Sequence, residues 1–139
     1  MSVGILVALV TGVAIASQVA IVGRTSARVH PLAISFALQA SGLLVGFGWV
    51  VWSRSWPSVG EVLRAWWWIP LGVVGWVVVA ALGFSSARVG TGATLALAIT
   101  AQVITGLTLD RLSGSFELGL PQIAGALLLV AGAVLVAWR

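Results

Sequence analysis

Five long apolar runs limit what this chain can fold into more than any other feature of its sequence. They cover approximately residues 3–23, 32–52, 65–87, 91–109 and 121–138. Each has close to the roughly 20 residues that a helix needs to cross the ~30 Å hydrocarbon core of a bilayer. Only short connectors remain between them. We therefore predict one transmembrane domain over residues 1–139, an all-α integral membrane protein built as a bundle of five transmembrane helices.

The composition excludes most other classes of protein. With 60% apolar and 7% charged residues, the 139-residue chain cannot give a water-soluble fold a polar surface. Barrel strands alternate apolar and polar residues, whereas these runs are continuous. The chain has no cysteine, one histidine and three acids, so we expect no metal site and no cofactor. The seven arginines are scattered singly along the chain, so we expect no nucleic acid partner. The sequence offers no nucleophile paired with a base, so we do not expect an enzyme.

The arginines say little about which way the chain is inserted. Alternation of five spans places four on one side and three on the other: Arg24, Arg28, Arg88 and Arg139 against Arg54, Arg64 and Arg111. The positive-inside rule needs a clear excess on the cytoplasmic side. The near balance predicts a weakly specified orientation, and insertion in both directions (dual topology) is one hypothesis. A single preferred orientation would place the Arg24 side in the cytoplasm.

Six of the eight tryptophans gather at one membrane face: Trp49, Trp52, Trp56, Trp66, Trp67 and Trp68. This is typical of an interfacial aromatic belt. Pro70 falls about one turn inside the run 65–87 and predicts a kink there. Trp76 lies near the middle of the same run, where it either packs against a neighbouring helix or forms a pathway wall that stacks on a substrate.

Polar residues recur on the faces of three of the predicted helices. Positions three or four apart share a face, so the fourth span has a polar stripe through Thr94, Gln102 and Thr105. Polar side chains avoid lipid, and we expect these groups to point inward. Two interpretations stay open, hydrogen bonds between helices and a hydrated substrate pathway. The candidate pathway residues are Gln18, Gln39, Gln102, Thr105, Thr94, Trp76 and Ser35.

No acid lies in the middle of any span. Proton-coupled exporters of cations usually hold an ionisable group at membrane depth. The coupling candidate is Asp110 at the end of the fourth span, and the alternative is a solvated boundary charge beside Arg111. His30 is predicted to be a loop histidine. The motif from Gly42 to Gly46, with Gly83 in the third span, predicts close helix contacts or a subunit interface.

Two stretches at the C-terminal half carry a family resemblance. They are "WWWIPLGVVGWVVVAALGFSSARVGTGATLALAITAQVITGLTLD" and "LPQIAGALLLVAGAVLVAWR". With their Trp pair before a proline, the "VGTGAT" turn, and Gln102 and Asp110 in the fourth span, they resemble the YdcZ-type family of small inner-membrane exporters. This family is in the drug/metabolite transporter (DMT) superfamily. In the first helix this sequence has Val19 after Gln18, where relatives have asparagine.

The resemblance implies one half of a ten-helix DMT transporter, located as a multi-pass protein in a bacterial plasma (inner) membrane. Two five-helix units in tandem are inverted relative to each other, as in many transporters. A lone unit regains that symmetry by pairing with an oppositely inserted copy or relative. The leading hypothesis is therefore a small-solute exporter that acts as an antiparallel homodimer or heterodimer in the lipid bilayer. Alternatives are a passive pore and a structural or accessory subunit.

Overall fold

The computed structural model describes residues 2–114 and 119–138, and this part of the chain contains six α-helices. They are α1 (Ser2–Thr25), α2 (Pro31–Ser53), α3 (Trp56–Arg64), α4 (Trp68–Val89), α5 (Thr91–Leu112) and α6 (Leu120–Ala137). All but α3 are long and apolar enough to cross a membrane. The five predicted spans are confirmed, with ends within about three residues of those expected.

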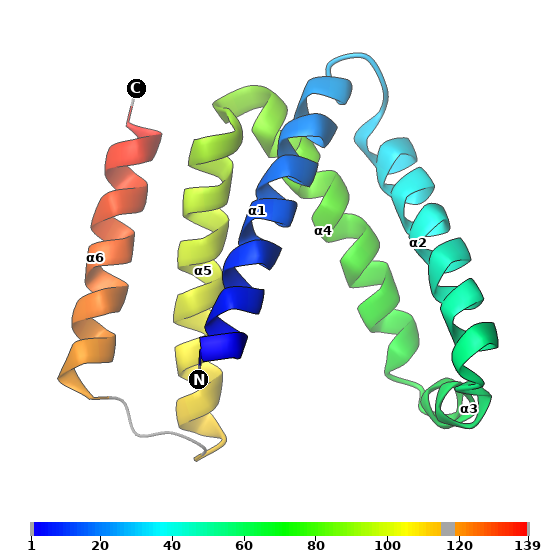
Figure 1. The fold of residues 1–139 in the computed structure, drawn as a ribbon. Helices are drawn as coiled ribbons and strands as arrows, with labels where there is room; N and C mark the ends of the chain where they lie inside the picture. The colour runs from blue at the N-terminus through cyan, green and yellow to red at the C-terminus, as the bar shows by residue number, and fades with distance from the viewer. Residues whose placement is uncertain (1, 115–118, 139) are drawn as a thin grey trace.

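The helices form an open layer rather than a closed bundle around a core. Four of them lie side by side in the order α6, α5, α4, α2, and α1 crosses one face of α4 and α5 (Figure 1). Only 6% to 17% of the most apolar window of each span is buried within the single chain. Apolar helix surface in a bilayer needs no protein cover, but polar surface does.

The crossing of α1 and α4 depends on two glycines. A Cβ at Gly23 would overlap the side chain of Ser86, and a Cβ at Gly83 would overlap Val22. Each helix thus has a glycine, which lacks a side chain, at the point of contact, and this lets the two backbones approach closely. Val19 of α1 is only 4% exposed, so the residue after Gln18 in this chain is buried by helix packing.

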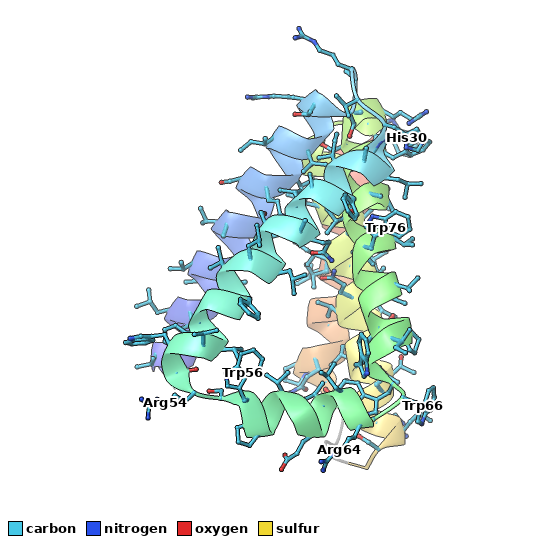
Figure 2. The ribbon with its side chains drawn as sticks, turned by 90° about the vertical axis from the view of Figure 1, so that its right-hand side faces the viewer. His30, Arg54, Trp56, Arg64, Trp66 and Trp76 are labelled. Carbon is cyan, nitrogen blue, oxygen red and sulfur yellow. The ribbon has the colours of Figure 1, made fainter. Side chains whose placement is uncertain are left out.

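Helix α3 was not predicted, because its proline and serines indicated a loop. Pro57 stands in the first turn, where its missing N–H breaks no hydrogen bond. Trp56, Val59 and Leu63 recur at helical spacing, while Glu61 lies between them. Such an amphipathic helix lies in the membrane interface. In Figure 2, α3 runs across the ends of α2 and α4, with Trp56 toward the spans and Arg64 directed away.

The tryptophan cluster lies at this same end of the layer. Trp56 meets Phe47 of α2 edge to face, with ring centroids 5.7 Å apart. The indole Nε1 of Trp68 donates to the carbonyl oxygen of Leu63 at 3.2 Å. These contacts connect α2, α3 and α4 at headgroup depth, where indole rings are favoured.

The predicted kink at Pro70 is wrong. Residues 65–67 form a bend and turn, so α4 begins at Trp68 and Pro70 is its third residue. A proline in the first turn removes no helical hydrogen bond. At the other end of α4 the predicted tight turn is confirmed. Gly90, with φ of 84°, separates α4 from α5 in a conformation that side chains disfavour.

Candidate functional site

A groove of about 560 Å³ between α4 and α5 contains two of the predicted pathway residues, Thr94 and Gln102. Both belong to one face of α5, since they are separated by two steps of four residues through Ala98. The facing wall of α4 is apolar except for Ser85 and Arg88. We call this the α4–α5 groove. It contains two residues of the polar stripe that was predicted on α5.

Thr94 differs from its neighbours on α5 in how its hydroxyl is used. It is 5% exposed, and its Oγ1 has no hydrogen-bond partner among the described residues. In contrast, Thr108 donates to the carbonyl oxygen of Ile104 at 2.8 Å. Thr100 donates to Ala96 at 2.7 Å and also to Leu129 of α6 at 3.4 Å. Thr94 therefore keeps an unused hydroxyl beside the groove, whereas Thr100 and Thr108 serve helix structure.

Gln102 supplies an amide to the deep end of the same groove. It is exposed at the surface of the single chain, although it stands near the middle of a span. An amide has two donors and two acceptor positions, and lipid tails satisfy none of them. Thr105 is also exposed on α5 but does not line the groove.

Ser35 and Trp76 are used in contacts between α2 and α4. Ser35 is fully buried, and its Oγ donates to the backbone oxygen of Trp76 at 2.6 Å. In return, the indole Nε1 of Trp76 donates to the carbonyl oxygen of Leu32 at 3.2 Å. This reciprocal pair satisfies two polar groups at membrane depth and joins the first turns of α2 to the middle of α4.

A second groove, which we call the lower α2–α4 groove, opens where α2 diverges from α4 (Figure 2). Its volume is about 630 Å³, and Gln39, Gly42, Gly72 and the ring of Trp76 line it. Gln39 is exposed, with its Nε2 near Gly75. Gln39 and Trp76 thus share a groove with each other and not with Gln102.

Gln18 lines neither groove and is exposed on α1. Of the three glutamines expected to point inward, Gln39 and Gln102 line grooves between helices, and all three are exposed in the single chain. The physical reason is the open layer, which has almost no interior between its five spans. Three exposed amides on apolar helices are costly in lipid, and they indicate surfaces that need a polar neighbour.

Asp110 does not line the α4–α5 groove, since it follows Gln102 by about two turns of α5. It is exposed in the last turn of α5, and the Oγ of Ser113 donates to its backbone oxygen at 3.0 Å. Among the described residues, no group of three acids or histidines lies close enough to hold a metal ion. Of the described residues that line the groove, Arg88 alone is charged. The groove thus offers hydrogen bonds and a positive rim.

Arg88 has a role that was not predicted, because the arginines were considered only for the orientation of the chain. Its guanidinium lies 3.3 Å above the centre of the Phe84 ring, and its Nη1 donates to the Phe84 carbonyl oxygen at 3.3 Å. The spacing of four residues between an aromatic and an arginine was the available signal. The stacked guanidinium forms the upper end of the α4–α5 groove.

Comparison with known proteins gives one family. The model of the family described as "Putative inner membrane exporter, YdcZ" matches residues 3–135, nearly the whole chain. No curated protein and no solved structure matches this chain significantly.

Proposed function

We propose a transport function for this chain, which belongs to the YdcZ family of inner membrane exporters. The function is export of a small solute by two units that pair in opposite orientations, each supplying half of the pathway. The observation that carries the proposal is the α4–α5 groove, where the Gln102 amide is free and Thr94, with a buried and unused hydroxyl, lies on the same face of α5. Unsatisfied polar groups at membrane depth mark solute pathways.

The distribution of charge supports antiparallel pairing. The seven arginines of the sequence divide four to three between the two sides, so neither side has a clear excess of positive charge. Such a balance gives the translocation machinery little preference between the two orientations. A five-helix unit paired with an inverted copy has the inverted-repeat symmetry of many transporters.

The open layer supports pairing independently of charge. Gln18, Gln39 and Gln102 are all exposed on apolar helices of the single chain. A second unit that covers these faces would enclose the amides between the two chains, where they can reach water, substrate or each other. The lining of the α4–α5 groove has no acid to bind a cation by charge, so a neutral or anionic solute fits it better.

The proposal is tested first on orientation, since the chain contains no cysteine. Ala27→Cys and Ser58→Cys place single exposed thiols at opposite ends of the layer. Each should be labelled to about half of its total by an impermeant thiol reagent added to intact cells. Complete labelling of one variant with none of the other would exclude the antiparallel homodimer and direct the search to an oppositely oriented relative.

The pathway is tested by Gln102→Ala. We expect this variant to lose solute export in a resistance screen against a broad panel of small toxic solutes, with its thermal unfolding unchanged. Thr108→Ala is the matched control, because it lies on the same helix and its hydroxyl serves only the carbonyl of Ile104. Full export by Gln102→Ala would remove this residue from the pathway. Flux that fails to saturate with concentration would favour a passive pore instead.

A further inference from the structure

A third groove lies at the end of the layer opposite the tryptophan cluster, between the start of α2 and the last half of α4. We call it the rim groove. Its volume is about 550 Å³, and its polar lining residues are Ser26, His30 and Arg88. Its floor is made of Leu32, Val77 and small alanines of α4. It shares Ala81, Phe84 and Arg88 with the α4–α5 groove, but Thr94 and Gln102 do not line it.

Two nitrogen-bearing side chains, those of Arg88 and His30, line the rim groove. The guanidinium of Arg88 is fixed against Phe84 by the ring and by the backbone oxygen. His30 caps α2, and its Nδ1 accepts from the N–H of Leu32 at 3.3 Å, so in the neutral imidazole the proton is on Nε2. The Oγ of Ser26 is buried and has no hydrogen-bond partner among the described residues, so it is not counted with these two donors. This donor set suits a group with several acceptor oxygens.

The charge at this end of the layer favours an anion. Arg24 and Arg88 stand in the last turns of α1 and α4, and Arg28 follows α1 in the connector to α2. The two described acids belong to α3 and to the end of α5, which lie at the opposite end of the layer (Figure 1). A guanidinium binds phosphate with two parallel hydrogen bonds, and one already held in position loses less entropy on binding. Arg88 stands in the last turn of α4, at headgroup depth.

The length of the apolar floor matches one leaflet of a bilayer. From Arg88 to Val77 the groove follows α4 for a rise of about 16 Å at 1.5 Å per residue. Half of the ~30 Å hydrocarbon core is about 15 Å. A cationic mouth at the interface with an apolar floor of this length fits a molecule with a phosphate head and an acyl chain.

We propose that the rim groove is a specific site for an anionic phospholipid, with the phosphodiester on Arg88 and His30 and one acyl chain along α4 toward Val77. Basic pockets between transmembrane helices bind acidic lipid headgroups elsewhere. The site goes beyond the proposed transport function and does not depend on it. A bound lipid here would also cover the outer face of the α2–α4 contact.

The test uses phosphatidylglycerol as the probe. The full chain is purified from vesicles that mix phosphatidylglycerol with phosphatidylcholine, and retained lipids are counted by native mass spectrometry. We expect preferential retention of phosphatidylglycerol by the wild type and a roughly tenfold weaker preference in Arg88→Gln. Arg28→Gln is the matched control, since it removes a charge at the same end without lining the groove. Arg88→Lys should recover part of the preference.

A second pair of variants tests the seat of the acyl chain. Val77→Trp fills the floor of the rim groove and leaves the charges unchanged, while Val73→Trp adds the same bulk to the exposed surface of α4 outside it. Only Val77→Trp should reduce retention. This pair keeps the proposal testable if Arg88→Gln unfolds, which thermal unfolding in phosphatidylcholine alone would reveal.

Several results would overturn the proposal. Equal losses in Arg88→Gln and Arg28→Gln would mean unspecific attraction to the rim, and equal retention of phosphatidylcholine would remove the role of charge. Displacement of phosphatidylglycerol by millimolar inorganic phosphate would show an anion site that needs no acyl chain. None of these readouts involves transport, so failure here leaves the proposed export function unaffected.

Discussion

Glycines occur both where α1 crosses α4 and along the lower half of α2, but only the first set makes contact within the chain. Gly23 and Gly83 meet side chains so closely that a Cβ would overlap them. Around Gly42 and Gly46 the space within 4 Å of an added Cβ is empty. The GxxxG motif from Gly42 to Gly46, which is typical of close helix packing, thus lies on an open face. The observed crossing of α1 and α4 does not use such a motif. The spacing of glycines on one helix shows that another helix can approach closely, but it does not identify that helix.

The largest expected effect breaks the α1–α4 crossing. Gly83→Leu forces a side chain into Val22, and overpacking of this kind costs about 1–3 kcal/mol. We expect a clear loss of thermal stability in detergent, followed by tryptophan fluorescence. Gly42→Leu is the matched control and should leave the unfolding of the single chain unchanged. Equal destabilisation by both would contradict the distinction between a closed and an open glycine face.

The next effect concerns the polar contact that joins α2 to α4. Ser35→Ala removes the hydrogen bond to Trp76 and should cost about 1 kcal/mol, a usual value for such bonds in membranes. Ser41→Ala should cost almost nothing, because Ser41 bonds only within its own helix, to Leu38. The comparison is made by thermal unfolding, and a cost for Ser41→Ala as large as that for Ser35→Ala would mean that the link between helices adds no stability.

The smallest effect separates two buried threonines of α5. Thr100→Val removes the hydroxyl that donates to the Leu129 carbonyl oxygen of α6, and this should lower the free energy of unfolding by about 0.6 kcal/mol. Thr94→Val loses no bond and removes an unpaired buried hydroxyl, so stability should be equal to or slightly above that of the wild type. If Thr94 serves the pathway, Thr94→Val should nevertheless reduce export. A stability loss greater for Thr94→Val than for Thr100→Val would assign Thr94 a structural hydrogen bond.

The spans could be predicted because hydropathy and length are properties of single segments. The belt of tryptophans and the turn at Gly90 were predicted for the same reason. The start of α4 and the whole of α3 were not, since a proline opens a helix as readily as it ends one. The amphipathic spacing of Trp56, Val59 and Leu63 was present in the sequence, but its length is only nine residues.

The candidate site could be predicted only in part. The sequence predicted a polar face on α5, and two residues of that face, Thr94 and Gln102, line one groove. Which polar groups are already satisfied depends on neighbouring helices, and the spacing along one helix cannot reveal them. The side chains of Ser35 and Trp76 each donate a hydrogen bond to the backbone of the other's helix. Gln39 and Gln102 line separate grooves, with their amides free.

By itself, the sequence determined that this is a five-span membrane protein with nearly balanced ends and with amides placed inside apolar helices. Those features follow from the free energy of moving each segment between water and lipid, which needs no knowledge of neighbours. Only the tertiary structure decided that α1 crosses α4 at Gly23 and Gly83, and that the layer stays open. It also placed Arg88 on Phe84 beside two grooves, because helix contacts in lipid depend on the shape and hydrogen bonds of both partners.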